Sequence, residues 1–139
     1  MFAASAKIGD WLGVDPPMTE ASVLNLIEQQ LDPPVIQRLL DMGLSRDEVH
    51  SVIIPARTLQ HRRSRQERLT IEESDRVIRA LRVLSAAERV YESRERALAW
   101  LRRPALRLEN RIPFSLLKTD TGARIVEELL TQIDEGFFV

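Results

Sequence analysis

Residues that favour the beginning or the end of a helix occur at short intervals along most of this chain. Two capping boxes of the Ser/Thr-x-x-Glu type, Ser45–Glu48 and Thr70–Glu73, mark helix starts, because each end of such a box bonds to the backbone N–H of the other. Prolines and glycines separate the apolar runs. Within the runs, apolar residues recur at helical spacing, and no alternating stretch is long enough for a convincing strand. The sequence therefore predicts an all-α fold.

The cap signals and the apolar spacing together place a series of helices along the chain. They are expected at residues 20–30, 33–42, 46–53, 56–65, 71–92, 94–101, 113–117 and 120–135. Residues 104–112 are expected to form a loop. No repeat or low-complexity linker separates the two halves of the chain. We therefore expect them to pack against each other as domains 1–68 and 69–139.

Composition excludes several classes of function. The chain has no cysteine, which rules out disulfides, thiolate zinc sites and a cysteine nucleophile. Its five glycines are too scattered for a glycine-rich phosphate loop, and aromatic residues, at 5%, are too few for a platform that stacks single-stranded bases. His50 and His61 have no acid cluster beside them and are expected to be surface residues rather than metal ligands. We expect no enzyme, no cofactor and no metal site.

Neither a membrane span nor an export signal is expected. No run of 18 apolar residues occurs, so no helix is expected to cross a membrane. The first six residues lack the charged head and the long apolar stretch of a secretory signal. A cytoplasmic protein with no membrane partner is expected.

The net charge of −1 conceals an uneven distribution of charge along the chain. Residues 1–50 carry a net −5, residues 51–111 a net +7 and residues 112–139 a net −3. Eighteen of the twenty cations are Arg, whose forked guanidinium pairs with phosphates, guanine edges and carboxylates where Lys offers a single point charge. The middle of the chain is therefore suited to binding an anion.

Three short predicted helices, at 33–42, 46–53 and 56–65, match a helix-turn-helix unit, in which braced helices hold a third in the major groove of DNA. The third helix is the candidate reading helix, and Leu59 would anchor it to the core. Arg and Gln are the side chains that make paired bonds to guanine and adenine edges. The candidates for the open, base-reading face are Arg57, Thr58, Gln60 and His61, and those for phosphate contacts are Arg62, Arg63, Arg65 and Arg68.

The alternative is a solvated basic helix that pairs with the acidic N-terminal third of the chain. Charge alone fits this alternative, whereas charge together with three correctly phased helices favours DNA. Because the chain is not basic overall, one copy is expected to bind DNA weakly. A homodimer is therefore the expected DNA-binding form.

Several segments between residue 44 and the end of the chain follow one another in a fairly specific order. They are Leu44–Glu48, Arg57–Leu59 with Arg62 and Arg63, Leu69–Arg76, Ala97–Leu101, Pro113–Leu117 with Thr119 and Gly122, and Val126–Leu130 with Ile133–Gly136. In this ordered series the chain resembles the Xre/MbcA/ParS family of bacterial antitoxins. That family often has Gly in the loop before the proline, where this chain has Glu109-Asn110-Arg111. Asn also tolerates left-handed backbone, so we expect the turn to form.

The resemblance implies an antitoxin with a DNA-binding half and a C-terminal toxin-binding half. Its partner would be a cognate RES-domain toxin, an enzyme that consumes NAD⁺ and is encoded beside it. The antitoxin would block the toxin and repress their shared operon by binding double-stranded operator DNA, and we expect a homodimer within a larger toxin–antitoxin complex. Two alternatives stay open. One is a stand-alone transcription factor whose C-terminal half only dimerises or binds another protein, and the other is a helical adaptor that does not bind DNA.

The chain ends in three large apolar residues that follow the predicted stop of the last helix. Such a tail is unusual in water, so we expect it to contact the toxin together with the last helix and nearby cations. The candidate toxin-binding residues are Arg111, Lys118, Arg124, Phe137, Phe138 and Val139. The alternatives are a tail folded onto its own core or used in a homodimer contact, and ordinary surface pairing for the cations.

Four further residues are expected to have structural roles. Trp11 and Trp100 are expected to be packing residues, with Trp100 a buried anchor of the C-terminal half. Pro113 is expected at the first position of a helix, where its missing N–H costs nothing, and Gly122 near the start of the next helix.

Overall fold

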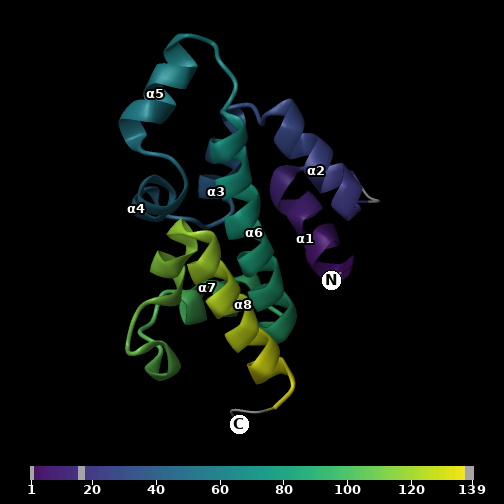
Figure 1. Ribbon diagram of the computed structural model, residues 1–139, viewed down its shortest axis with the longest axis vertical. Coiled ribbons are helices and arrows are strands. Elements are labelled where there is room, and N and C mark those ends of the chain that lie inside the picture. The colour runs from purple at the N-terminus through teal and green to yellow at the C-terminus, as the bar shows by residue number, and fades with distance from the viewer. Residues whose placement is uncertain (1, 16–17, 137–139) are drawn as a thin grey trace.

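The computed structural model describes residues 2–15 and 18–136 and has an all-α fold (Figure 1). Its helices are α1 (Phe2–Leu12), α2 (Glu20–Gln29), α3 (Pro34–Asp41), α4 (Arg46–Glu48), the π-helical η1 (Val49–Ile53), α5 (Ala56–Ser64), α6 (Ile71–Tyr91), α7 (Arg94–Leu101), the 3₁₀ segments η2 (Leu106–Leu108) and η3 (Pro113–Lys118), and α8 (Asp120–Asp134). The predicted helices are confirmed to within a few residues, and α1 is an additional helix. Within the described ranges, no helix is both long enough and apolar enough to cross a membrane.

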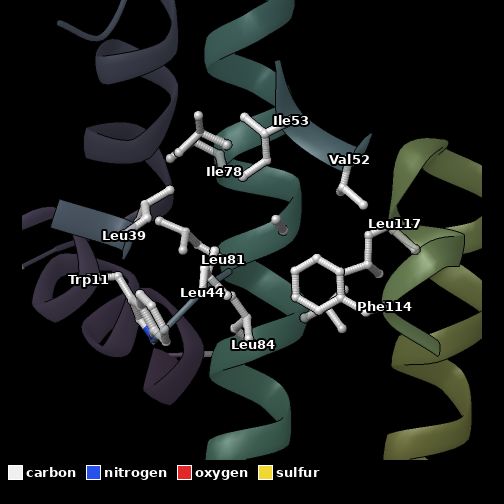
Figure 2. Packing of buried hydrophobic residues seen from close by; sticks show 14 of the residues in the cluster. Trp11, Leu39, Leu44, Val52, Ile53, Ile78, Leu81, Leu84, Phe114 and Leu117 are labelled. Atoms are coloured by element: carbon white, nitrogen blue, oxygen red, sulfur yellow. The ribbon is translucent and has the colours of Figure 1, made fainter. Parts of the chain in front are cut away.

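α6 is the axis of the fold. α1 and α2 pack on it from one side, and α7, α8 and η3 pack on it from another (Figure 1). Its most deeply buried apolar residues are Val77, Ile78, Ala80, Leu81, Val83, Leu84 and Ala87, each at most 1% exposed. Figure 2 shows Leu84 of α6 between Trp11 on one side and Phe114 on the other. Only Ile71, Glu72 and Arg89 of α6 are exposed, so helices pack around most of its circumference. It therefore gives both halves of the chain a shared core.

α1 contributes core residues although the sequence carries no clear start signal for it. Ile8 and Trp11 are fully buried, where α1 packs against α3 and α6. Arg38 of α3 donates to the Asp10 carbonyl at 2.8 Å and to the Trp11 carbonyl at 2.9 Å, near the end of α1. The Trp11 indole N–H donates to the buried Glu88 carboxylate, and the Arg94 guanidinium lies 4.7 Å from the centroid of the Trp11 ring. The prediction that Trp11 is a packing residue is confirmed.

α3, α4 with η1, and α5 form the helix-turn-helix unit. The predicted capping box opens α4: the Ser45 hydroxyl accepts from the Glu48 N–H at 3.0 Å, and the Glu48 carboxylate accepts from the Ser45 N–H at 2.8 Å. The helix then widens into η1, whose last carbonyl, that of Ile53, accepts from Arg76 of α6 at 2.7 Å. α6 therefore satisfies the end of the helix that braces α5.

The loop before η3 forms a tight, closed turn. Ala105 and Arg111 join in an isolated antiparallel bridge, and Asn110 has the left-handed backbone expected for it, with φ of 63°. Pro113 stands at the start of η3, as predicted. Gly122 is buried at the start of α8, and a Cβ there would lie 2.0 Å from the Leu116 carbonyl oxygen.

Trp100 packs against the core, which confirms it as a packing residue, but it is half-buried, so the prediction that it is a buried anchor is wrong. α7 turns Ala97, Leu98 and Leu101 into the core, and Leu101 is fully buried. Position 100 lies at the edge of that stripe. The Trp100 ring instead lies beside Tyr91, with ring centroids 6.0 Å apart and planes inclined by 32°.

Candidate nucleic-acid interface

α5 stands at one end of the molecule, away from the helices that surround the middle of α6 (Figure 1). Its buried side chain is Leu59, at 4% exposure, which packs in the core, and most of the remaining surface of the helix is open to solvent. The predicted DNA-binding residues on this open side are the exposed Arg57, Gln60, His61, Arg63 and Arg65 and the half-buried Thr58. The structure therefore brings the predicted base-reading residues and two predicted phosphate contacts onto one surface.

The positive charge of this surface is not neutralised by neighbouring acids. Across the part of the chain that the structure describes, Arg57, Arg63 and Arg65 take part in no ion pair. An Arg fork suits either a phosphate or the paired acceptors of a guanine edge. The open side of α5 therefore combines long-range attraction for a polyanion with side chains that can read bases.

Arg62 was predicted to contact phosphate, and the structure instead pairs it within the protein. Its Nε and Nη2 donate to the two carboxylate oxygens of Glu73 in α6, at 3.1 and 3.0 Å, and its Nη1 donates to Glu67 at 3.3 Å. The Arg62 side chain is 21% exposed and that of Glu73 is 6% exposed. Position 62 falls one turn after Leu59, on the side of α5 that faces the protein. Arg63 follows it on nearly the same side of the helix but is exposed, so it is the contact with Glu73 that distinguishes Arg62.

Glu73 is also held by its own helix, because it closes the capping box that opens α6. Its Oε1 accepts from the Thr70 N–H at 2.8 Å, and its own N–H donates to the Thr70 hydroxyl at 3.1 Å. Burial raises the pKa of the Glu73 carboxyl, but the bonds from Arg62 and Thr70 outweigh burial, and the pKa lies below its usual value. The bond to Glu73 also raises the pKa of Arg62. Both groups are therefore charged at neutral pH.

Arg68, the remaining predicted phosphate contact, lies in the turn between α5 and α6. Its Nη1 donates to the Gln30 carbonyl at 2.8 Å and lies 3.4 Å from Asp32 Oδ1. The side chains of Arg68 and Asp32 are both more than half exposed. An ion pair this exposed contributes little and exchanges readily. Arg68 therefore remains at the surface beside α5.

A second Arg–Glu fork joins the helix-turn-helix unit to the C-terminal half. Arg102, which follows α7, donates to both carboxylate oxygens of Glu48 at 2.7 and 2.8 Å and to the Gly43 carbonyl at 2.7 Å. Burial raises the pKa of Glu48, but the bonds from Arg102 and Ser45 outweigh it and bring the pKa below its usual value. The sequence predicts both capping boxes, but it does not predict that the glutamate of each box also accepts hydrogen bonds from an arginine outside the box. No local pattern connects residues so far apart.

Two of the predicted toxin-binding cations come together in the C-terminal half. Arg111 and Lys118 are exposed and line one surface hollow between the closed turn, η3 and the start of α8. Leu108 and Leu116 line the same hollow, as does Ile125, which is 46% exposed. This surface therefore offers positive charge beside an apolar contact area.

The other predicted toxin-binding residues are not part of this hollow. Arg124 pairs with Asp120 one turn earlier in α8, at 2.7 Å, and both side chains are largely exposed. Phe137, Phe138 and Val139 lie outside the described residues.

The two histidines lie apart. His50 is half-buried, with its Nδ1 2.9 Å from the Ile54 carbonyl oxygen, and His61 is exposed on α5. In the described portions of the chain, no three side chains of His, Asp or Glu gather in a way that would hold a metal ion.

Two protein-family profiles match the chain. The antitoxin Xre-like helix-turn-helix domain matches residues 23–82, and the antitoxin Xre/MbcA/ParS C-terminal toxin-binding domain matches residues 86–136. The first match runs from α2 into α6, and the second runs from the later part of α6 to the end of α8. α6 therefore contributes to both matched regions.

Three curated relatives are each named antitoxin Xre. The protein from Pseudomonas putida is 37% identical over 100 residues, which are 72% of this chain and 63% of the relative. The protein from Yersinia enterocolitica is 40% identical over 86 residues, 61% of this chain and 58% of the relative. The protein from Photorhabdus laumondii is 26% identical over an alignment of 143 positions, which covers 98% of this chain and 97% of the relative. The chain therefore spans less than two thirds of the first two relatives and nearly all of the third.

Proposed function

Because this chain belongs to the Xre/MbcA/ParS antitoxin family, we propose that it neutralises a RES-domain toxin that degrades NAD⁺ and represses the operon that encodes both proteins. A helix-turn-helix domain followed by a toxin-binding domain points to a binding protein rather than an enzyme. The observation that carries the DNA-binding part is the open side of α5, where three arginines without an ion pair in the described residues flank a Gln and a Thr.

On DNA, α5 enters the major groove. Arg57 and Gln60 reach base edges, while Arg63 and Arg65 contact phosphates on either side. One copy supplies few such contacts, and the net charge of −1 gives the whole chain no general attraction for DNA. Two copies on a pair of half-sites provide the affinity that one copy lacks. We therefore assign operator binding to a homodimer.

Replacing Arg57 by Ala is expected to weaken binding to the operon's own promoter by about 1–3 kcal/mol, because one paired contact to a base is lost. Binding to a random duplex of equal length is expected to change much less. Fluorescence anisotropy with both duplexes, at low and at moderate salt, measures the two affinities. Arg124→Ala is the matched control, since it removes an exposed arginine far from α5 and leaves both affinities unchanged. An equal loss on the random duplex would make Arg57 a phosphate contact, and a wild-type protein that ignores its promoter even at low salt would refute operator binding.

The surface hollow lined by Arg111 and Lys118 is the toxin-binding site that we propose within the described part of the chain. Neither cation has an ion pair among the described residues, and Ile125 adds an exposed apolar contact. Acidic side chains on the partner would complete the charge pairing, with apolar contact beside them. We propose that Arg124 and the tail formed by Phe137, Phe138 and Val139 contribute to the same interface.

The double charge reversal Arg111→Glu with Lys118→Glu is expected to weaken toxin binding at least about tenfold, because two attractive contacts become repulsive. Calorimetric titration of the purified toxin measures the change. The reversal Arg46→Glu, at an exposed arginine of the helix-turn-helix unit, is the control and leaves toxin affinity unchanged. A separate variant that ends at residue 135 tests the tail. Unchanged toxin affinity in the double reversal excludes the hollow, and unchanged affinity in the shortened chain excludes the tail.

A further inference from the structure

α5 depends on few contacts for its orientation. Leu59 is its one buried side chain, and the helix lies at the end of the molecule rather than between other helices (Figure 1). Leu59 fixes how close α5 lies to the core, but a single apolar contact leaves the helix free to rotate and tilt about that point. Such a rotation would move Arg57 and Gln60 relative to the bases that they read. A second point of attachment is therefore needed for α5 to present a defined surface.

The Arg62–Glu73 pair supplies that second point. The guanidinium and the carboxylate meet through two nearly equal bonds of 3.1 and 3.0 Å, so the planes of both groups are fixed relative to each other. The carboxylate is in turn fixed to the first turn of α6 by the Thr70 N–H at 2.8 Å. A third bond, from Arg62 to Glu67 at 3.3 Å, ties the pair to the intervening turn. Arg62 therefore connects the reading helix to α6, the helix that contributes the largest number of buried residues in the described chain.

From this geometry we propose that Arg62 and Glu73 are positioning residues that set the orientation of α5 for sequence-specific DNA binding, and that Arg62 is not a phosphate contact. The inference rests on the proposed binding of operator DNA by α5. Glu73 is 6% exposed, so a phosphate that drew Arg62 away would leave a nearly buried carboxylate without its charged partner. Arg62 therefore stays on Glu73 when DNA is bound.

The positioning role and a phosphate contact predict opposite results for conservative variants. Arg62→Lys keeps the positive charge but loses the fork that matches a carboxylate. A phosphate contact would tolerate this change. A positioning pair does not, and we expect affinity for the promoter to fall by about 5- to 100-fold, the equivalent of one lost base contact, while affinity for a random duplex changes less than about threefold.

Glu73→Gln provides the second, sharper comparison. Gln retains the shape of Glu and can still close the capping box, but it gives Arg62 one carbonyl oxygen in place of a carboxylate. If Arg62 were a phosphate contact restrained by Glu73, this variant would free it and raise affinity for every duplex. For a positioning pair we expect the reverse, a fall in affinity for the promoter of the same order as in Arg62→Lys.

Arg82→Lys is the matched control, because Arg82 makes an equal two-bond pair with Glu20, at 2.9 and 2.9 Å, between α6 and α2 and away from α5. This variant is expected to leave promoter affinity unchanged. Hydrogen exchange of the α5 amides, measured without DNA, tests the pair independently: exchange is expected to be faster in Arg62→Lys and Glu73→Gln than in the wild type or in Arg82→Lys.

The two sets of measurements separate this inference from the proposed function. A wild-type protein that does not bind its promoter would refute operator binding, and α5 exchange would still show whether the pair holds the helix. A wild-type protein that binds, with unchanged promoter affinity in Arg62→Lys or increased affinity for both duplexes in Glu73→Gln, would overturn the positioning role.

Discussion

Trp11→Ala is expected to lower the free energy of unfolding by about 3–5 kcal/mol, the usual loss for truncating a fully buried tryptophan. The Trp11 side chain has no exposed surface and joins α1 to α3 and α6. Its removal opens a cavity in the core. It also deprives Glu88, which is 6% exposed, of a hydrogen-bond donor, and it removes the aromatic ring that the Arg94 guanidinium lies over. Urea unfolding followed by far-ultraviolet circular dichroism measures the change, since the substitution removes a fluorophore.

Trp100→Ala is the matched comparison for Trp11→Ala, because it removes the same side chain from a half-buried position. Its expected cost is smaller, since much of the Trp100 surface already contacts water and the cavity left behind is open. An equal loss in the two variants would contradict the half-buried position of Trp100. A loss below about 1 kcal/mol for Trp11→Ala would contradict the assignment of α1 to the core.

Gly122→Ala is expected to destabilise the protein by about 1–3 kcal/mol or more, although alanine is the better helix former by about 1 kcal/mol. The added Cβ would lie 2.0 Å from the Leu116 carbonyl oxygen and 2.9 Å from its carbonyl carbon, both backbone atoms that cannot move aside as a side chain would. The start of α8 must therefore separate from η3. Since Arg111 and Lys118 line the hollow at this junction, toxin affinity is expected to fall as well.

Gly9→Ala is the control for Gly122→Ala, because it makes the same substitution within a helix at a less crowded site. There the nearest atom to the added Cβ is the Val14 carbonyl oxygen at 3.2 Å, so a shift of a few tenths of an ångström suffices. Thermal unfolding of both variants provides the comparison. A Gly122→Ala protein as stable as the wild type would show that the α8–η3 junction is not as close as the structure describes.

The sequence predicts those parts of the fold that local chemistry determines. Both capping boxes, at Ser45 and Thr70, are present with both of their bonds. The left-handed Asn110 and the proline at the start of η3 also follow from the preferences of single residues. The helix-turn-helix unit could be predicted because its three helices begin and end at such signals.

The sequence does not predict features that depend on tertiary contacts. α1 is stabilised by burial of Ile8 and Trp11 against other helices, and no start signal in the described residues marks it. Trp100 matches a core pattern but lies at the edge of the buried stripe of α7. The pairing of Arg62 with Glu73 is missed for the same reason, because the partner lies 11 residues away in another helix.

Co-expression of this chain with the RES-domain toxin proposed as its partner, in a strain that carries a reporter under the proposed shared promoter, tests the central claim that α5 binds the operator and the C-terminal half binds the toxin. The wild-type chain is predicted to restore growth and silence the reporter, whereas Arg57→Ala is predicted to restore growth and leave the reporter active. A wild-type chain that leaves the toxin lethal and the reporter active would contradict the account.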